Sequence, residues 1–143
     1  MASTFFKSLV DTTYDSIEGY KKVIEKASDP HLKSELEKLL ANRNDTLTQL
    51  NAELQKQGDE LVTKGTATGA LHRAWIDIVG LFENGDENAA ERLSEGESFL
   101  ASKFEEALES GVMSTSEEEV VKSALVNIRA SEQIAKSLVL EHD

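Results

Sequence analysis

Residues 68–82 read TGALHRAWIDIVGLF, and this stretch decides the topology that the rest of the chain indicates. It is shorter and more apolar than the charged segments on either side, and it carries Trp75, the only tryptophan. A glycine-rich linker precedes it, and the turn residues Asn84-Gly85-Asp86 follow it. Its apolar residues recur at three- and four-residue steps, which predicts a helix over about 68–83. We therefore expect two long helices before this crossover helix and two after it.

The two segments before the crossover predict an antiparallel helical hairpin. The first has apolar residues at helical spacing over about 4–27, and Thr4 is its expected N-cap. Asp29 and Pro30 suit the N-cap and the first position of a second helix over about 30–57, which carries a stripe of leucines. Because the connection is so short, the second helix is expected to fold back on the first.

The two segments after the crossover predict a second hairpin. We expect one helix over about 86–110, capped by Asp86 and ended by a left-handed Gly111. Another is expected over about 116–140. Before it, each of the hydroxyl residues 114–116 has a glutamate three positions on, which is the signature of a capping box.

Length and composition suit one globular domain spanning residues 1–143. Hydrophobic residues make up 39% of the chain and charged residues 29%, which is typical of a folded rather than a disordered protein. Two helical hairpins joined by a long crossover predict an all-α fold, a ferritin-like four-helix bundle with a short helix in the crossover connection.

The formal net charge of −12 makes some classes of partner unfavourable. An acidic surface repels phosphate backbones and anionic lipid headgroups, so we expect neither nucleic acid nor membrane as a partner. The chain has no cysteine, which excludes disulfides and thiolate metal ligands. The sequence shows no secretory signal pattern and no apolar run that would span a bilayer, so we expect a cytoplasmic protein.

A polar residue interrupts the apolar stripe of each long segment. These four residues are Glu18, Arg43, Glu97 and Glu132. Ferritin-like di-iron proteins bind metal through a glutamate from each of two helices and a Glu-x-x-His motif from each of the other two. None of the three histidines here has a glutamate three positions before it. We therefore predict no cofactor, and keep iron or manganese on the three glutamates as the alternative.

The favoured interpretation of these polar residues is an ion pair in the core. An unpaired buried carboxylate is costly, and a guanidinium can bind both of its oxygens. We therefore predict that Arg43 contacts Glu18, Glu97 or Glu132. The sequence contains no nucleophile elbow and no phosphate-binding glycine loop. No catalytic residue is named, and an enzyme is not favoured.

Four short motifs occur in the order in which a known family has them. They are Glu18-Gly19-Tyr20, Asp29-Pro30, residues 69–75 (GALHRAW) and Gly96-Glu97. The most specific part is LHRAW, residues 71–75. Together they resemble an uncharacterised bacterial family of small four-helix-bundle proteins, a domain of unknown function in the ferritin-like superfamily. The resemblance implies a ferritin-like fold and no established activity.

Three classes of function remain open. The favoured one is a non-enzymatic helical bundle that acts in stress or envelope physiology through protein contacts. We expect it to be a homodimer, with Phe5, Tyr14 and Leu40 as candidate contact residues. The second is a metal-binding or storage-like protein that uses the three glutamates. The third is a protein that binds a small apolar ligand in a cavity near Trp75.

Overall fold

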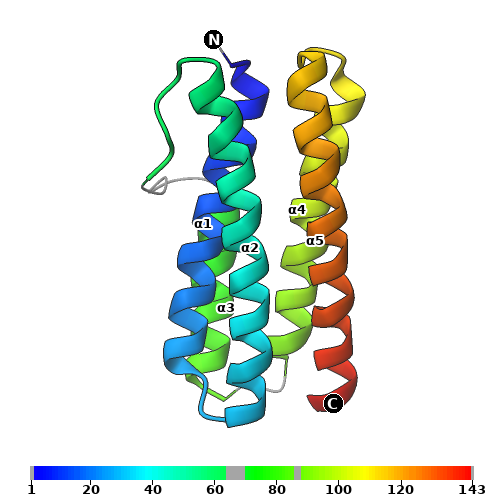
Figure 1. Ribbon diagram of the computed structural model, residues 1–143. Coiled ribbons are helices and arrows are strands. Elements are labelled where there is room, and N and C mark those ends of the chain that lie inside the picture. The colour runs from blue at the N-terminus through cyan, green and yellow to red at the C-terminus, as the bar shows by residue number, and fades with distance from the viewer. Residues whose placement is uncertain (1, 64–69, 86–87, 143) are drawn as a thin grey trace.

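The computed structural model describes residues 2–63, 70–85 and 88–142. These residues form five helices and no strand, which confirms the all-α prediction. In chain order (Figure 1) the helices are α1 (Thr4–Lys26), α2 (Pro30–Lys56), α3 (Ala70–Glu83), α4 (Ala89–Ser110) and α5 (Thr115–His142). Within the described ranges, no helix has the length and apolar character that crossing a membrane requires.

Three of the predicted helix ends are confirmed by their hydrogen bonds or backbone angles. The Asp29 carboxylate accepts a hydrogen bond from the His31 amide, with Pro30 in the first turn of α2. At the start of α5, the Ser114 hydroxyl accepts from the Glu117 amide at 3.1 Å, and the Glu117 carboxylate accepts from the Ser114 amide at 3.0 Å. This is the reciprocal capping box. Gly111 ends α4 with a φ of 72°.

Two predicted helix starts need correction or lie outside the described residues. Ser3, not Thr4, caps α1: its hydroxyl accepts from the Phe6 amide at 3.1 Å. Ser3 takes this position because its own amide and hydroxyl donate to Glu117, which holds it in an extended conformation before the helix. α4 begins at Ala89, and the predicted cap Asp86 lies outside the described residues.

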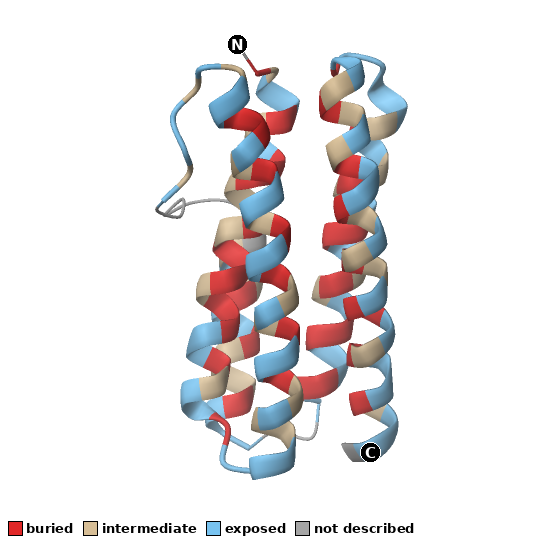
Figure 2. Ribbon diagram, viewed as in Figure 1, coloured by how far each residue is buried: buried red, intermediate tan, exposed pale blue. Residues whose placement is uncertain are grey.

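The four long helices form two hairpins, α1 with α2 and α4 with α5, which pack side by side (Figure 1). α2 and α5 run antiparallel along their whole length. The His31 ring contacts Glu141 near one end, and the Lys56 ammonium donates to the Ser116 hydroxyl near the other. Buried residues lie on the sides of the helices that face one another (Figure 2).

α3 packs against both α1 and α4. Glycines on these two helices allow the close approach. A β-carbon at Gly19 would overlap the indole of Trp75, and one at Gly96 would lie 3.3 Å from the end of the Ile78 side chain. The crossover therefore places Trp75 in the core beside Tyr20, with ring centroids 4.9 Å apart.

Candidate functional site

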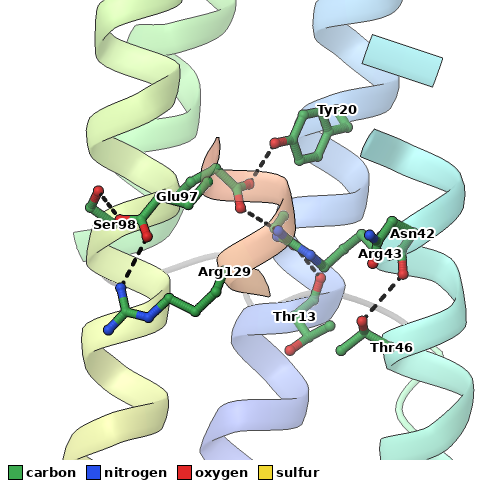
Figure 3. A network of polar contacts seen from close by, with 10 residues as sticks. Thr13, Tyr20, Asn42, Arg43, Thr46, Glu97, Ser98 and Arg129 are labelled. Carbon is green, nitrogen blue, oxygen red and sulfur yellow. Dashed lines mark hydrogen bonds and ion pairs between the residues drawn. The ribbon is translucent and has the colours of Figure 1, made fainter. Parts of the chain in front are cut away.

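An ion pair between Arg43 and Glu97 lies in the middle of the core (Figure 3). The Arg43 Nη2 atom of α2 donates to the Glu97 Oε2 atom of α4 at 2.5 Å, and both side chains are only 1% exposed. Arg43 is the largest fully buried side chain among those described. Hydrogen bonds between ionised groups are shorter and stronger than neutral ones, and here one connects the two hairpins through the interior.

The second oxygen of Glu97 is taken by Tyr20. The Tyr20 hydroxyl donates to Glu97 Oε1 at 2.5 Å, and its ring lies 5.7 Å from the Arg43 guanidinium carbon. Burial, and then the charge of Glu97, raise the pKa of Tyr20 well above its ordinary value. The hydroxyl therefore stays protonated and acts as a donor, and both oxygens of the carboxylate are satisfied.

The other end of the guanidinium is held by α1. Arg43 Nη1 donates to the Ser16 hydroxyl at 2.8 Å, and that hydroxyl donates to the Thr13 carbonyl at 2.7 Å. Among the described residues, Arg43 Nε has no hydrogen-bond partner. The network thus joins α1, α2 and α4, and its two ionised groups carry opposite charges.

Glu132 lies in a separate polar cluster between α4 and α5. Its carboxylate accepts from the Ser98 hydroxyl and, at 3.0 Å, from Arg129, which also pairs with Glu105. Burial acts to raise the pKa of Glu132, but the hydrogen bonds from Ser98 and Arg129, together with the charges of Lys136 and Arg129, outweigh it and the pKa is lowered. Glu132 is 5% exposed, whereas the side chain of Arg129 is 42% exposed.

Glu18 lies outside both clusters. Its side chain is 42% exposed and reaches Lys21 at 3.7 Å. Of the three glutamates predicted as candidate partners or metal ligands, only Glu97 contacts Arg43. Across the described part of the chain, no three or more His, Asp or Glu side chains are grouped so that they could hold a metal ion.

Sequence reasoning missed two of the residues that complete the central network, Ser16 and the hydroxyl of Tyr20. The signal that could have found them is the phase of the first helix. Its buried positions include Phe6, Thr13, Ser16 and Tyr20, at steps that keep one helix face. Glu18 lies off that face, so it was the wrong polar residue to select on α1.

The predicted contact residues lie at or near the surface, whereas Trp75, expected beside a ligand cavity, is itself buried. Phe5 is 37% exposed, and Tyr14 and Leu40 are half-buried, with Leu40 packed against the core. His72 and Trp75 line an open cleft between α1 and α3. None of the residues that line the cleft belongs to the hydrogen-bond network of the ion pair.

The fold and the site define an all-helical protein whose core contains a neutral network built on one arginine and one glutamate. Residues 1–110 match the family model described as a domain of unknown function (DUF2383), and the chain belongs to this family. The matched part ends with the last residue of α4, so α5 lies beyond it. Neither the curated proteins nor the solved structures contain a match to this chain.

Proposed function

We propose that the protein is a ferritin-like four-helix bundle in which the Arg43–Glu97–Tyr20 network takes the place of a metal centre. On this proposal it works by binding, through protein contacts or self-association, and not by catalysis. Two hairpins joined by one long crossover support the ferritin-like assignment, because ferritin-like bundles use one such connection. The family match gives no activity, so the site carries the proposal.

The observation that carries the proposal is that both carboxylate oxygens of Glu97 already accept a hydrogen bond from the protein. A ferritin-like di-metal centre needs carboxylate oxygens that are free to bind cations, and one histidine from each of two helices. Here one oxygen of Glu97 accepts from Tyr20 and the other from a guanidinium whose positive charge would repel a metal ion. Glu18 points away from this centre and Glu132 has its own partners. The residues present do not fit a di-iron or di-manganese site.

A binding function is supported by the outer surface. Among the described residues, three large apolar side chains that lie away from the α1–α3 cleft are more than half exposed: Val112, Val126 and Leu140. Covering apolar surface removes it from water, which favours association with a second copy or with another protein. We propose a homodimer as the simplest such assembly.

Metal analysis tests the central claim. The protein is expressed with added iron and manganese, purified without chelator, and compared with Glu97→Ala and with Glu18→Ala as the exposed control. We expect no stoichiometric metal in any of the three, and no rise in thermal midpoint when either metal is added. Stoichiometric metal that is lost in Glu97→Ala but kept in Glu18→Ala would overturn the proposal and establish a carboxylate metal site.

Sedimentation equilibrium tests the self-association. We expect a dimer whose dissociation is concentration-dependent. A monomer over the whole accessible concentration range would remove self-association and leave contacts with a different protein.

A further inference from the structure

A cleft of about 540 Å³ lies between α1 and α3, beside Trp75, where the sequence predicts a possible site for a small apolar ligand, and the function proposed above does not use it. Its volume falls within the range of small-molecule sites. The residues that line it come from two turns of α1 and from most of α3. They are Asp15, Glu18, Gly19, Lys22, His72, Trp75, Ile76, Val79, Gly80 and Glu83.

The order of the charged residues along the cleft follows from α1 and α3 running in the same direction. Trp75 packs on Gly19, and about two turns further along both helices Glu83 pairs with Lys26 at 3.9 Å. Asp15, Glu18 and His72 therefore lie towards one end, and Lys22 and Glu83 towards the other.

The middle of the cleft is apolar and open. Trp75, Ile76 and Val79 form its wall, and Ile76 is 59% exposed. A β-carbon at Gly80 would meet no atom within 4 Å, so this glycine leaves space in the cleft. An apolar group placed here would remove both its own surface and that of Ile76 from water.

The end of the cleft that contains Asp15 and Glu18 is acidic. Asp15 and Glu18 are one turn apart on α1, and Asp11 lies one turn earlier. Burial, and then the charge of Asp15, raise the pKa of Asp11; burial, and then the charge of Glu18, raise that of Tyr14. In each case the second cause is the negative charge of a carboxylate that lines this end of the cleft. The only ion pair of Glu18 given by the described residues is a loose surface contact with Lys21.

We propose that this cleft binds an amphiphilic amine, with its apolar body on Trp75, Ile76 and Val79 and its ammonium group beside Asp15 and Glu18. The carboxylates favour a cation and disfavour a carboxylate or phosphate headgroup, as does the net charge of −12. The proposal goes beyond the association proposed above and stands independently of it, because it concerns a small molecule and a different surface.

Calorimetric titration with three compounds of equal chain length tests the proposal: n-octylamine, 1-octanol and octanoate, each below its aggregation limit. We expect saturable binding of one octylammonium per chain, weaker binding of octanol and the weakest of octanoate. The emission of Trp75, the only tryptophan, should change with the same saturation curve. Absence of saturable octylamine binding, or equal binding of octanoate, would overturn the proposal.

Three variants locate the site. Gly80→Leu fills the cleft and replaces a helix-interior glycine by a better helix former, so the protein should stay folded and lose binding. Glu18→Gln should weaken octylamine binding about two- to fivefold, as expected for a partly exposed ion pair. Glu37→Gln, an exposed position on α2, should leave it unchanged. Unchanged binding by folded Gly80→Leu, checked by circular dichroism, would place the ligand elsewhere and contradict the proposal.

Discussion

Glu97 of α4 and Glu132 of α5 are both buried, but their surroundings differ. Each is a buried carboxylate that accepts one hydrogen bond from an arginine and one from a hydroxyl group. The arginine of Glu97 is 1% exposed and makes its only ion pair there, as far as the described residues extend. The arginine of Glu132, Arg129, is 42% exposed and divides its hydrogen-bonding capacity between Glu132 and Glu105.

The difference teaches that the arginine, more than the carboxylate, decides what each pair contributes. Removing one member of a fully buried pair leaves the other charged and desolvated. When the arginine reaches water, its loss lets solvent and neighbouring groups compensate. The central pair, Arg43 with Glu97, and the outer pair, Arg129 with Glu132, should therefore respond differently to substitution.

Replacement of Arg43 should have the largest effect. Arg43→Met keeps much of the side-chain length but leaves the Glu97 carboxylate without its cation, so we expect the free energy of unfolding to fall by about 3–5 kcal/mol. Urea denaturation followed by circular dichroism measures the loss.

The double variant Arg43→Met with Glu97→Leu is the control. Exchange of both members of a buried ion pair for apolar residues is often close to neutral. The double variant should therefore be more stable than Arg43→Met alone. A double variant as unstable as the single one would show that lost packing around Arg43, and not an unpaired charge, causes the effect.

Removal of the Tyr20 hydroxyl should have a smaller effect on the same centre. Tyr20→Phe deprives one Glu97 oxygen of its donor while the ring stays in place, so we expect a loss of about 1–2 kcal/mol. The matched control is Tyr14→Phe, at a half-buried position on the same helix, for which we expect less than about 0.5 kcal/mol. Equal losses in the two variants would contradict a special role for Tyr20.

The contribution of the outer pair to the stability of the protein should depend on pH. The folded-state pKa of Glu132 is lowered from 4.5, so its stabilising contribution is complete above that value and is lost as the pH falls through the lower folded-state pKa. Glu132→Gln should cost about 1 kcal/mol at neutral pH. This difference from the wild type should shrink in acid, as measured by urea denaturation across the acidic range. A difference that stays constant would show that the charge of Glu132 contributes nothing.

Replacement of Arg129 should have the smallest effect. Arg129→Met removes a half-exposed partner, so we expect a loss of at most about 1 kcal/mol, reduced further by added salt. Thermal or urea unfolding at low and high salt measures it. A loss as large as that of Arg43→Met would remove the contrast between the two pairs.

The helical architecture could be predicted from the sequence because its signals are local. Asp29, Pro30, the 114–117 capping box and Gly111 act on their own backbone neighbourhood, and their roles follow from residue type and spacing. The predicted cap of α1, Thr4, was wrong because Ser3 takes this place, held by Glu117, which lies 114 positions later in the sequence. A contact of that kind leaves no local signal.

The candidate site was only partly predictable. Arg43 and Glu97 lie on the buried stripes of their helices, so their burial could be inferred from periodicity. The choice of Glu97 over Glu132 as the partner of Arg43 depends on how α2, α4 and α5 are rotated about their axes, which periodicity does not determine. Glu18 was the wrong residue to expect in the core, because a helix residue two positions from the centre of the buried stripe faces away from that stripe.

The position of α3 between α1 and α4 has a consequence for the order of folding. The contacts within each hairpin are close in sequence and can form quickly. Joining the hairpins requires closure of the chain between Lys56 and Ala89, which costs loop entropy. Because α3 packs on both α1 and α4, we expect its packing, with Trp75 against Gly19, to be complete only after the two hairpins have joined. The single tryptophan thus provides an optical signal for completion of the core.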